Sequence, residues 1–196
     1  FMKAFNLILA ALLLTGCASQ PAGGDADAPQ TDSSRALASA KIHTELAGMY
    51  YERGQYGVAL EELAIALKKD SDYAPAYNVR GLVNMALLED EQAERDFRRS
   101  LDLDENNSGA RNNYGWFLCQ RGRERESVKQ FMAAVKNPLY ATPEKAFLNA
   151  GLCSKKAGMM IEAEGYLKRA LIMQPKMAEA LLGMAELNYA KADFVT

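Results

Sequence analysis

The feature that most constrains the fold of this chain is an internal repeat of about 34 residues. Twelve residues after each of the first four repeated small residues lies a second small residue, and four residues further on lies a large apolar one. Periods of roughly 20 to 50 residues are typical of stacked helical or strand units. The repeated small residues, at spacings of 34, 34, 36 and 34, are Ala47, Gly81, Gly115, Gly151 and Ala185; the second small residues are Ala59, Ala93, Ser127 and Ala163, and the large ones are Leu63, Phe97, Phe131 and Leu167.

The residue types at these positions suit a helix–turn–helix unit. Two helices can cross closely where both present small side chains, and the large apolar residue fills the space beside the crossing. A glycine in the turn supplies the left-handed conformation that ends the first helix. Gly54, Gly122 and Gly158 stand at that position, whereas the second unit has Leu88. Four units in register favour an all-α solenoid over the alternative, an unrelated helical bundle.

This pattern resembles the tetratricopeptide repeat, and Pro175 stands where that repeat carries its closing proline. The array is expected over 35–196, with units at 40–73, 74–107, 108–141 and 144–177 and a partial fifth unit from 178. Solenoids need polar caps at their ends. The fifth unit leaves Leu181, Met184 and Leu187 without a second helix, so we expect the natural protein to continue with at least one more helix after Thr196.

The N-terminal residues 1–16 are predicted to be a signal peptide. Lys3 precedes an apolar run from Ala4 to Leu14, which is far shorter than the roughly 20 residues that span a bilayer. The run ends in Leu-Thr-Gly-Cys, which resembles the lipobox of bacterial lipoproteins and implies acylation of Cys17 after cleavage. The alternative is an ordinary secretory signal with an incidental cysteine.

Residues 17–34 are expected to form a lipidated cysteine and a flexible tether. The stretch from Ser19 to Ser34 has no large apolar residue and cannot offset the entropy of ordering. Several acyl chains on Cys17 give stable membrane attachment. Ala18 follows Cys17, as in outer-membrane lipoproteins, whereas an Asp there would signal retention in the inner membrane. We therefore expect a lipid-anchored protein on the periplasmic face of a Gram-negative outer membrane.

The composition argues against catalysis and nucleic-acid binding. The 23 basic and 25 acidic residues nearly cancel, so no excess of positive charge is available for phosphates. The chain has one histidine, His43, and lacks the sequence motifs of metalloproteases, phosphate loops, hydrolases and zinc sites. We expect no enzymatic activity, cofactor, metal or small-molecule substrate. The alternative is an enzyme whose catalytic part lies beyond Thr196.

The first helices of the units are expected to line a groove that binds a partner. Apolar side chains interleaved with amides suit an extended peptide or an amphipathic helix of another protein. The alternative is that residues such as Met85 and Trp116 only pack between neighbouring units. The candidate groove residues are Tyr51, Asn78, Leu82, Met85, Asn112, Trp116, Gln120, Leu148, Leu152 and Lys155.

Cys119 and Cys153 lie near the middle of first helices in consecutive units. The oxidising compartment that Cys17 implies permits a disulfide between them. Geometry decides, because their Cα atoms must lie within about 7 Å. We predict a disulfide here; the alternative is two buried free thiols.

The whole chain is similar to the type IV pilus biogenesis and stability lipoproteins called PilW or PilF. The most specific stretches are Asn112–Leu118, Leu139-Tyr140 and Phe147–Leu152. This resemblance implies a non-catalytic protein that helps the pilus secretin reach the outer membrane and assemble, or that stabilises the pilus fibre. Its partners would be the secretin or other pilus proteins. The alternative function is a general periplasmic adaptor for cell-wall enzymes or outer-membrane assembly factors.

Overall fold

The computed structural model describes residues 31–193, and within this range the chain forms nine α-helices and no strand. The all-α prediction is therefore confirmed. The predicted signal peptide, Cys17 and most of the tether lie outside the described residues. No helix in the described range is both long and apolar enough to cross a membrane. The helices are α1 (Asp32–Glu52), α2 (Tyr56–Lys69), α3 (Ala74–Ala86), α4 (Asp90–Leu103), α5 (Ser108–Gln120), α6 (Glu124–Ala134), α7 (Pro143–Lys156), α8 (Met160–Met173) and α9 (Ala178–Asp193).

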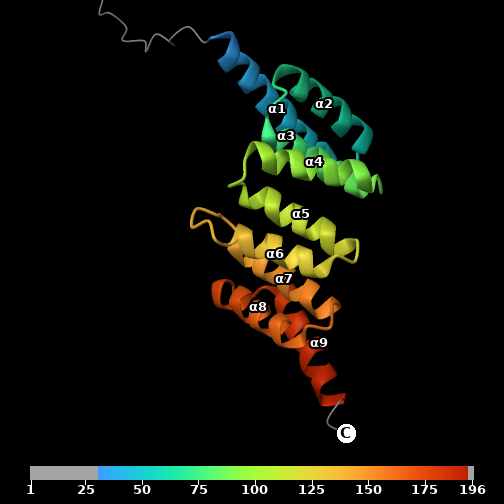
Figure 1. Ribbon diagram of the computed structural model, residues 1–196, viewed down its shortest axis with the longest axis vertical. Coiled ribbons are helices and arrows are strands. Elements are labelled where there is room, and N and C mark those ends of the chain that lie inside the picture. The colour runs from blue at the N-terminus through green and yellow to red at the C-terminus, as the bar shows by residue number, and fades with distance from the viewer. Residues whose placement is uncertain (1–30, 194–196) are drawn as a thin grey trace, which may run out of the picture. The chain divides into compact units, whose positions relative to one another are not determined.

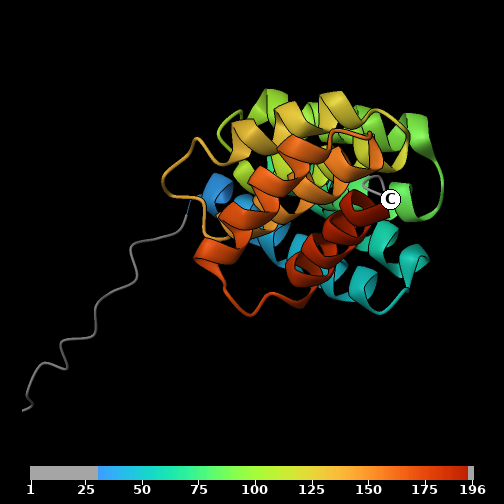
Figure 2. The same ribbon diagram turned by 90° about the horizontal axis from the view of Figure 1, so that it is seen from below.

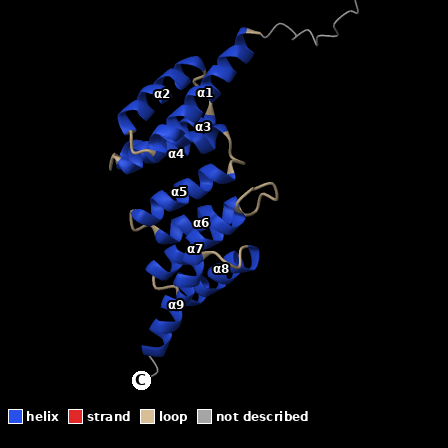
Figure 3. Cartoon of the chain, turned by 180° about the vertical axis from the view of Figure 1, so that it is seen from behind, coloured by secondary structure: helices blue, strands red, loops and turns tan. Residues whose placement is uncertain are grey.

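Consecutive helices form hairpins, α1 with α2 through α7 with α8, and α9 is the first helix of a further unit (Figures 1 and 3). Each first helix approaches the first helix of the next unit, from α1 through α3, α5 and α7 to α9. No second helix of the described hairpins approaches another second helix. In a stack, the helices that lie closer together form the inner side of the curve, so the first helices make one continuous inner wall.

The predicted pairing of small and large residues is confirmed in three units. A Cβ atom added to Gly81 would lie 2.8 Å from the Phe97 ring, and one added to Gly115 would lie 2.7 Å from the Phe131 ring. At Gly151 the nearest atom would be Leu167 Cγ at 2.6 Å. An added Cβ at these distances would force the neighbouring side chain to shift, so glycine permits the close helix crossing in these three hairpins, whereas the first hairpin has Ala47 there.

The turns between the helices adopt the left-handed conformation with or without glycine. Gly54, Gly122 and Gly158 have φ angles of 71°, 75° and 74°, and Leu88 at the matching position has φ 64°. A non-glycine residue pays about 1–2 kcal/mol for this conformation. The hydrogen bond from Glu89 N to Asn84 O, 2.9 Å, closes the turn in the same way as in the glycine units. The hairpin therefore imposes this backbone shape on a leucine.

The predicted end of the tether at residue 34 is wrong by three residues, because α1 begins at Asp32. Thr31 caps this helix: its Oγ1 accepts from Ser34 N at 3.2 Å, and Ser34 Oγ donates to Thr31 O at 2.8 Å. Such capping satisfies backbone groups that a helix end otherwise leaves unpaired. The polar residues that suggested a tether therefore also provide the start of the first helix.

Leu187 of α9 is already covered by the preceding unit, although a second helix of the fifth unit was expected to cover it. This residue is 1% exposed and joins the apolar cluster that contains Leu167, because the preceding unit already covers that face of α9. Met184 packs against the same cluster, whereas Leu181 is 49% exposed. The regularly spaced apolar residues of α9 thus pack against α7 and α8 of the preceding unit.

Candidate partner-binding groove

The ten predicted groove residues lie on the first helices α1, α3, α5 and α7, and none of them is buried. Gln120 is exposed and the other nine are partly exposed. Figure 2 gives the view along the stack from below, with α9 in front. The wall that the sequence predicted is therefore accessible over four consecutive units.

The apolar groove residues also pack between helices. Leu82 and Met85 contact the buried cluster around Phe97, and Trp116 contacts the cluster that contains Phe131. Leu148 and Leu152 contact the cluster around Leu167. Each of these side chains thus has one face in the core and another at the surface, so packing between units is observed, and binding of a partner at the exposed face stays a prediction.

Two pairs of asparagines connect neighbouring units across the wall. Asn113 Nδ2 donates to Asn78 Oδ1 at 3.1 Å, between α5 and α3. Asn149 Nδ2 donates to Asn112 Oδ1 at 3.0 Å, between α7 and α5. Asn78 and Asn112 were predicted as groove residues from the sequence, whereas their partners Asn113 and Asn149 were not. In the sequence, each partner could have been found as an Asn one position after the equivalent residue of the next unit.

The groove lysine Lys155 forms an ion pair with Glu186 of α9. Its charge is therefore already compensated within the described part of the protein. The side chain of Gln120 forms no recorded hydrogen bond with another described residue. Of these two polar groove residues, Gln120 has the freer side chain for a partner.

Cys119 and Cys153 are joined by a disulfide in the structure, with their Cα atoms 5.9 Å apart. This distance lies in the range that a disulfide requires. Both residues are buried, and the bond connects α5 to α7 between the third and fourth units. Lys156 Nζ also donates to Cys119 O at 2.7 Å. The wall is thus covalently fixed at the point where the longest loop separates two units.

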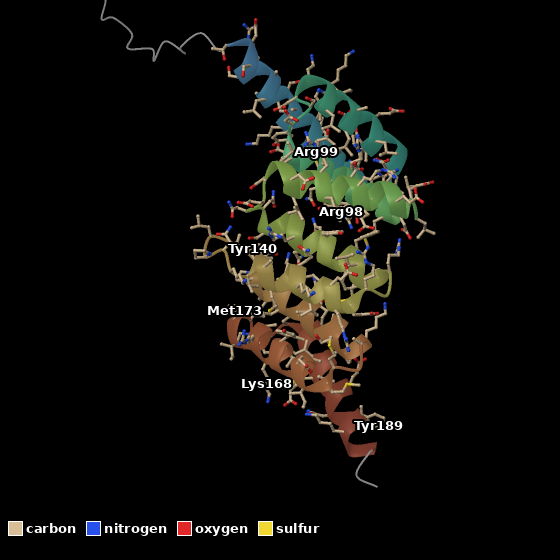
Figure 4. The ribbon with its side chains drawn as sticks, viewed as in Figure 1. Arg98, Arg99, Tyr140, Lys168, Met173 and Tyr189 are labelled. Carbon is tan, nitrogen blue, oxygen red and sulfur yellow. A yellow bond between two sulfur atoms is a disulfide. The ribbon has the colours of Figure 1, made fainter. Side chains whose placement is uncertain are left out.

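The arginines of α4 and of the turn before α6 face acidic partners away from the wall. Arg98 Nη2 donates to Glu94 Oε1 at 2.7 Å, and Arg99 pairs with Asp72; Figure 4 labels both arginines on α4. Arg123 Nη1 also donates to Glu94 Oε1, at 2.9 Å. Desolvation alone would raise the pKa of Glu94, but hydrogen bonds from Arg123, Tyr114 and Arg98 lower it.

The first unit also carries a set of exposed apolar side chains that was not predicted from the sequence. Ile42 and Met49 on α1 are separated by seven residues, as are Val58 and Ile65 on α2. Two turns of helix place such residues on one face. The spacing was visible in the sequence, but the repeat pattern drew attention only to the inward positions.

Comparisons with known proteins place these features in a family context. No family model matches the chain. PilF of Pseudomonas aeruginosa, a type IV pilus assembly protein, is 29% identical over 194 residues, which cover 99% of this chain and 75% of PilF. The crystal structure of PilW, a widely conserved type IV pilus biogenesis factor, is 37% identical with a TM-score of 0.73 and covers 77% of this chain and 69% of PilW.

Two further structures support the same fold. The structure of P. aeruginosa PilF is 27% identical with a TM-score of 0.77, and covers 82% of this chain and 72% of PilF. The structure of MamA is 22% identical with a TM-score of 0.60, covers 71% of this chain and 81% of MamA, and bears on the fold alone.

Within the described residues, no group of three or more His, Cys, Asp or Glu side chains is arranged to hold a metal ion.

Proposed function

This chain belongs to the PilW family of tetratricopeptide proteins of type IV pilus biogenesis, and from this premise we propose that it is an outer-membrane lipoprotein that binds a pilus-machinery protein in its groove. Tetratricopeptide arrays are scaffolds for protein–protein contacts, and the inner wall of α1, α3, α5 and α7 is the surface assigned to the partner. The proposed partner is the pilus secretin, whose arrival and assembly in the outer membrane the protein assists.

In this proposal the acyl chains on Cys17 hold the protein at the periplasmic face of the outer membrane. The polar stretch that begins at Ser19 separates the folded array from the lipid and lets it search for its partner. The groove then holds a segment of the secretin while the ring assembles, or a protein that keeps the extended fibre stable. No step requires catalysis, so affinity and position are the only demands on the array.

One observation supports the groove most directly: its apolar residues are packed on one side and exposed on the other. Leu82 and Trp116 keep fixed positions because the neighbouring helices hold them. A partner therefore meets a surface with little side-chain freedom left to lose, which favours binding. Large aromatic side chains at such places often dominate the energy of an interface.

The test is the substitution of Leu82→Ala together with Trp116→Ala in the lipidated protein. The double variant should recover at least tenfold less secretin than the unaltered protein in a pull-down from gently solubilised outer membranes, read by mass spectrometry. Its helical content, measured by circular dichroism, should stay unchanged. Ile161→Ala with Ile172→Ala is the matched control, because these α8 side chains are 85% and 79% exposed and lie outside the groove.

Three outcomes would contradict the proposal. Equal loss of binding and helicity would show that Leu82 and Trp116 are structural. Unchanged capture by the double variant, with loss in Ile42→Ser plus Met49→Ser, would move the contact to the exposed face of the first unit. Recovery of cell-wall enzymes or outer-membrane assembly factors without any pilus component would favour the general adaptor.

A further inference from the structure

A hollow of about 530 Å³ opens on the groove side where the third, fourth and fifth units meet. Asn112 of α5 and Leu148 of α7, both among the predicted groove residues, line it. Lys145 and Asn149 of α7 complete that side, and the loop before α9 supplies Lys176 and Met177. The groove therefore has a distinct end where amide, apolar and charged groups gather.

The amides of this hollow retain hydrogen-bonding capacity. Asn149 uses one N–H to reach Asn112 Oδ1, and the structure records no other bond from either side chain to a described residue. A side-chain amide has two donors and an acceptor with two lone pairs. The second N–H and Oδ1 of Asn149 and the Nδ2 group of Asn112 are therefore available to a ligand. Asn78 and Asn113 repeat the same arrangement one unit earlier.

These amides favour an extended chain over a helix. A peptide group matches a side-chain amide, since each presents one donor beside one acceptor. In a helix the backbone groups are already paired with each other, whereas in an extended segment they remain free. Two amide pairs in consecutive units thus provide successive contacts for one extended main chain.

The charges of the hollow select an acidic segment. Lys145 and Lys176 are exposed, and neither forms an ion pair with an acidic side chain among residues 31–191. Lysines nearby behave differently: Lys155 pairs with Glu186, and Lys156 with Glu124 at 3.5 Å. Glu179 also lines the hollow, so its ionisable side chains carry two positive charges and one negative charge. The net positive charge complements a carboxylate.

We propose that this hollow binds an acidic, extended segment of the partner protein, an inference that rests on the proposed function of the groove. The main chain of the segment pairs with the amides of Asn112 and Asn149. An Asp or Glu side chain within the segment meets Lys145 and Lys176, and its apolar neighbours on the alternate face rest on Leu148 and Met177. Alternation of acidic and apolar residues is the pattern that an extended strand needs for this.

The probe for the test is a fluorescein-labelled decapeptide of alternating Leu and Asp with both ends blocked. Fluorescence anisotropy with the full chain should show at least tenfold tighter binding than for the matched Leu–Lys decapeptide. Lys145→Gln with Lys176→Gln should weaken binding about five- to tenfold, the effect of losing two exposed charge pairs. Lys69→Gln with Lys129→Gln, on exposed parts of α2 and α6, has the same charge change and should alter binding less than twofold.

A Leu–Asp decapeptide methylated on alternate backbone nitrogens tests the main-chain contacts and should bind at least fivefold more weakly. Equal binding of the Leu–Lys peptide, equal loss in both double lysine variants, or full binding of the methylated peptide would overturn the inference. Much tighter binding of a Leu–Asp peptide with a free C-terminus would also overturn it, because the occupant would then be a chain end.

The two proposals fail separately. Full secretin capture by Lys145→Gln with Lys176→Gln would overturn the acidic-segment inference and leave the groove function standing. Unchanged secretin capture by Leu82→Ala with Trp116→Ala would instead overturn the proposed function, on which the inference rests.

Discussion

Two equivalent junctions of this solenoid are held together by different chemistry. Between the second and third units, Phe97 of α4 packs against Phe117 with ring centroids 5.7 Å apart, and Arg121 forms an ion pair with Asp90 at 2.6 Å. Between the third and fourth units, the Cys119–Cys153 disulfide crosses from α5 to α7. The backbone arrangement repeats, but the side chains that stabilise each junction do not.

The difference shows how far a repeat array can vary its contacts without changing its fold. In such arrays each unit is stabilised mainly by its neighbours, so each junction contributes its own free energy. Truncation of side chains or acid lowers the stability of an aromatic and ionic junction. Reduction lowers the stability of a disulfide junction. The loop 137–142 lies at the junction between the third and fourth units, where Leu139 is 88% exposed and Tyr140 packs against the cluster that contains the disulfide.

The largest loss of stability is expected from Phe97→Ala, which breaks the second junction, the one between the second and third units. Phe97 is fully buried under Gly81 and contacts Tyr114 and Phe117 of the next unit. Removing such a side chain costs about 3–5 kcal/mol. Chemical denaturation would give the loss of stability, and hydrogen exchange should show it mainly in α3 to α5. Leu139→Ala is the exposed control. Equal loss of protection in α7 and α8 would contradict the picture of separate junctions.

The next largest loss of stability is expected from Cys119→Ala with Cys153→Ala, which breaks the third junction, the one between the third and fourth units. The two residues are separated by 34 positions, and a loop of that length corresponds to about 3–4 kcal/mol of stabilisation in the chain-entropy account. Hydrogen exchange should now report faster opening in α5 to α8 and leave α1 to α3 protected. Thiol counting on the unfolded, unreduced lipoprotein should find no free thiol, because the sulfur of Cys17 carries lipid in the proposed lipoprotein and Cys119 and Cys153 are paired. Two free thiols would show that the bridge is absent in the protein.

The smallest effect is the acid sensitivity of the second junction through Glu94. Its folded-state pKa is lowered, since the hydrogen bonds from Arg123, Tyr114 and Arg98 outweigh desolvation. Its contribution, about 1 kcal/mol, is therefore fully present above the unfolded pKa of about 4.3 and is lost as the pH falls through the folded pKa below that value. Glu94→Gln should be less stable than the unaltered protein at pH 7, and the gap should close towards pH 3.

Denaturation curves at pH 7, 5, 4 and 3 would measure that gap, with Glu61→Gln as a control on an exposed face of α2. A gap that stays constant from pH 7 to pH 3 would contradict the role assigned to Glu94. The Cys119–Cys153 junction provides the internal reference, because a disulfide does not titrate in this range.

Much of the fold could be predicted because close helix crossings demand particular residue sizes. A Cβ at Gly81, Gly115 or Gly151 would displace the side chain packed against it, and the resulting preference for small residues is visible in the sequence as a period. Part of the groove could be predicted for the same reason, since residues at fixed offsets from the crossing must face the inner wall. Lys145 and Lys176 were missed because 31 positions separate them, and only the approach of α9 to α7 brings them to one hollow.

The sequence by itself determined the helical hairpins and the register of the units, because local periodicity and residue size act within each unit. The family resemblance also depended on the sequence, through short stretches such as Asn112–Leu118. Only the tertiary structure decided the left-handed turn at Leu88, the asparagine pairs and the charge left uncompensated at Lys145 and Lys176. These depend on contacts between units, and such contacts are set by how whole helices pack rather than by any one stretch of chain.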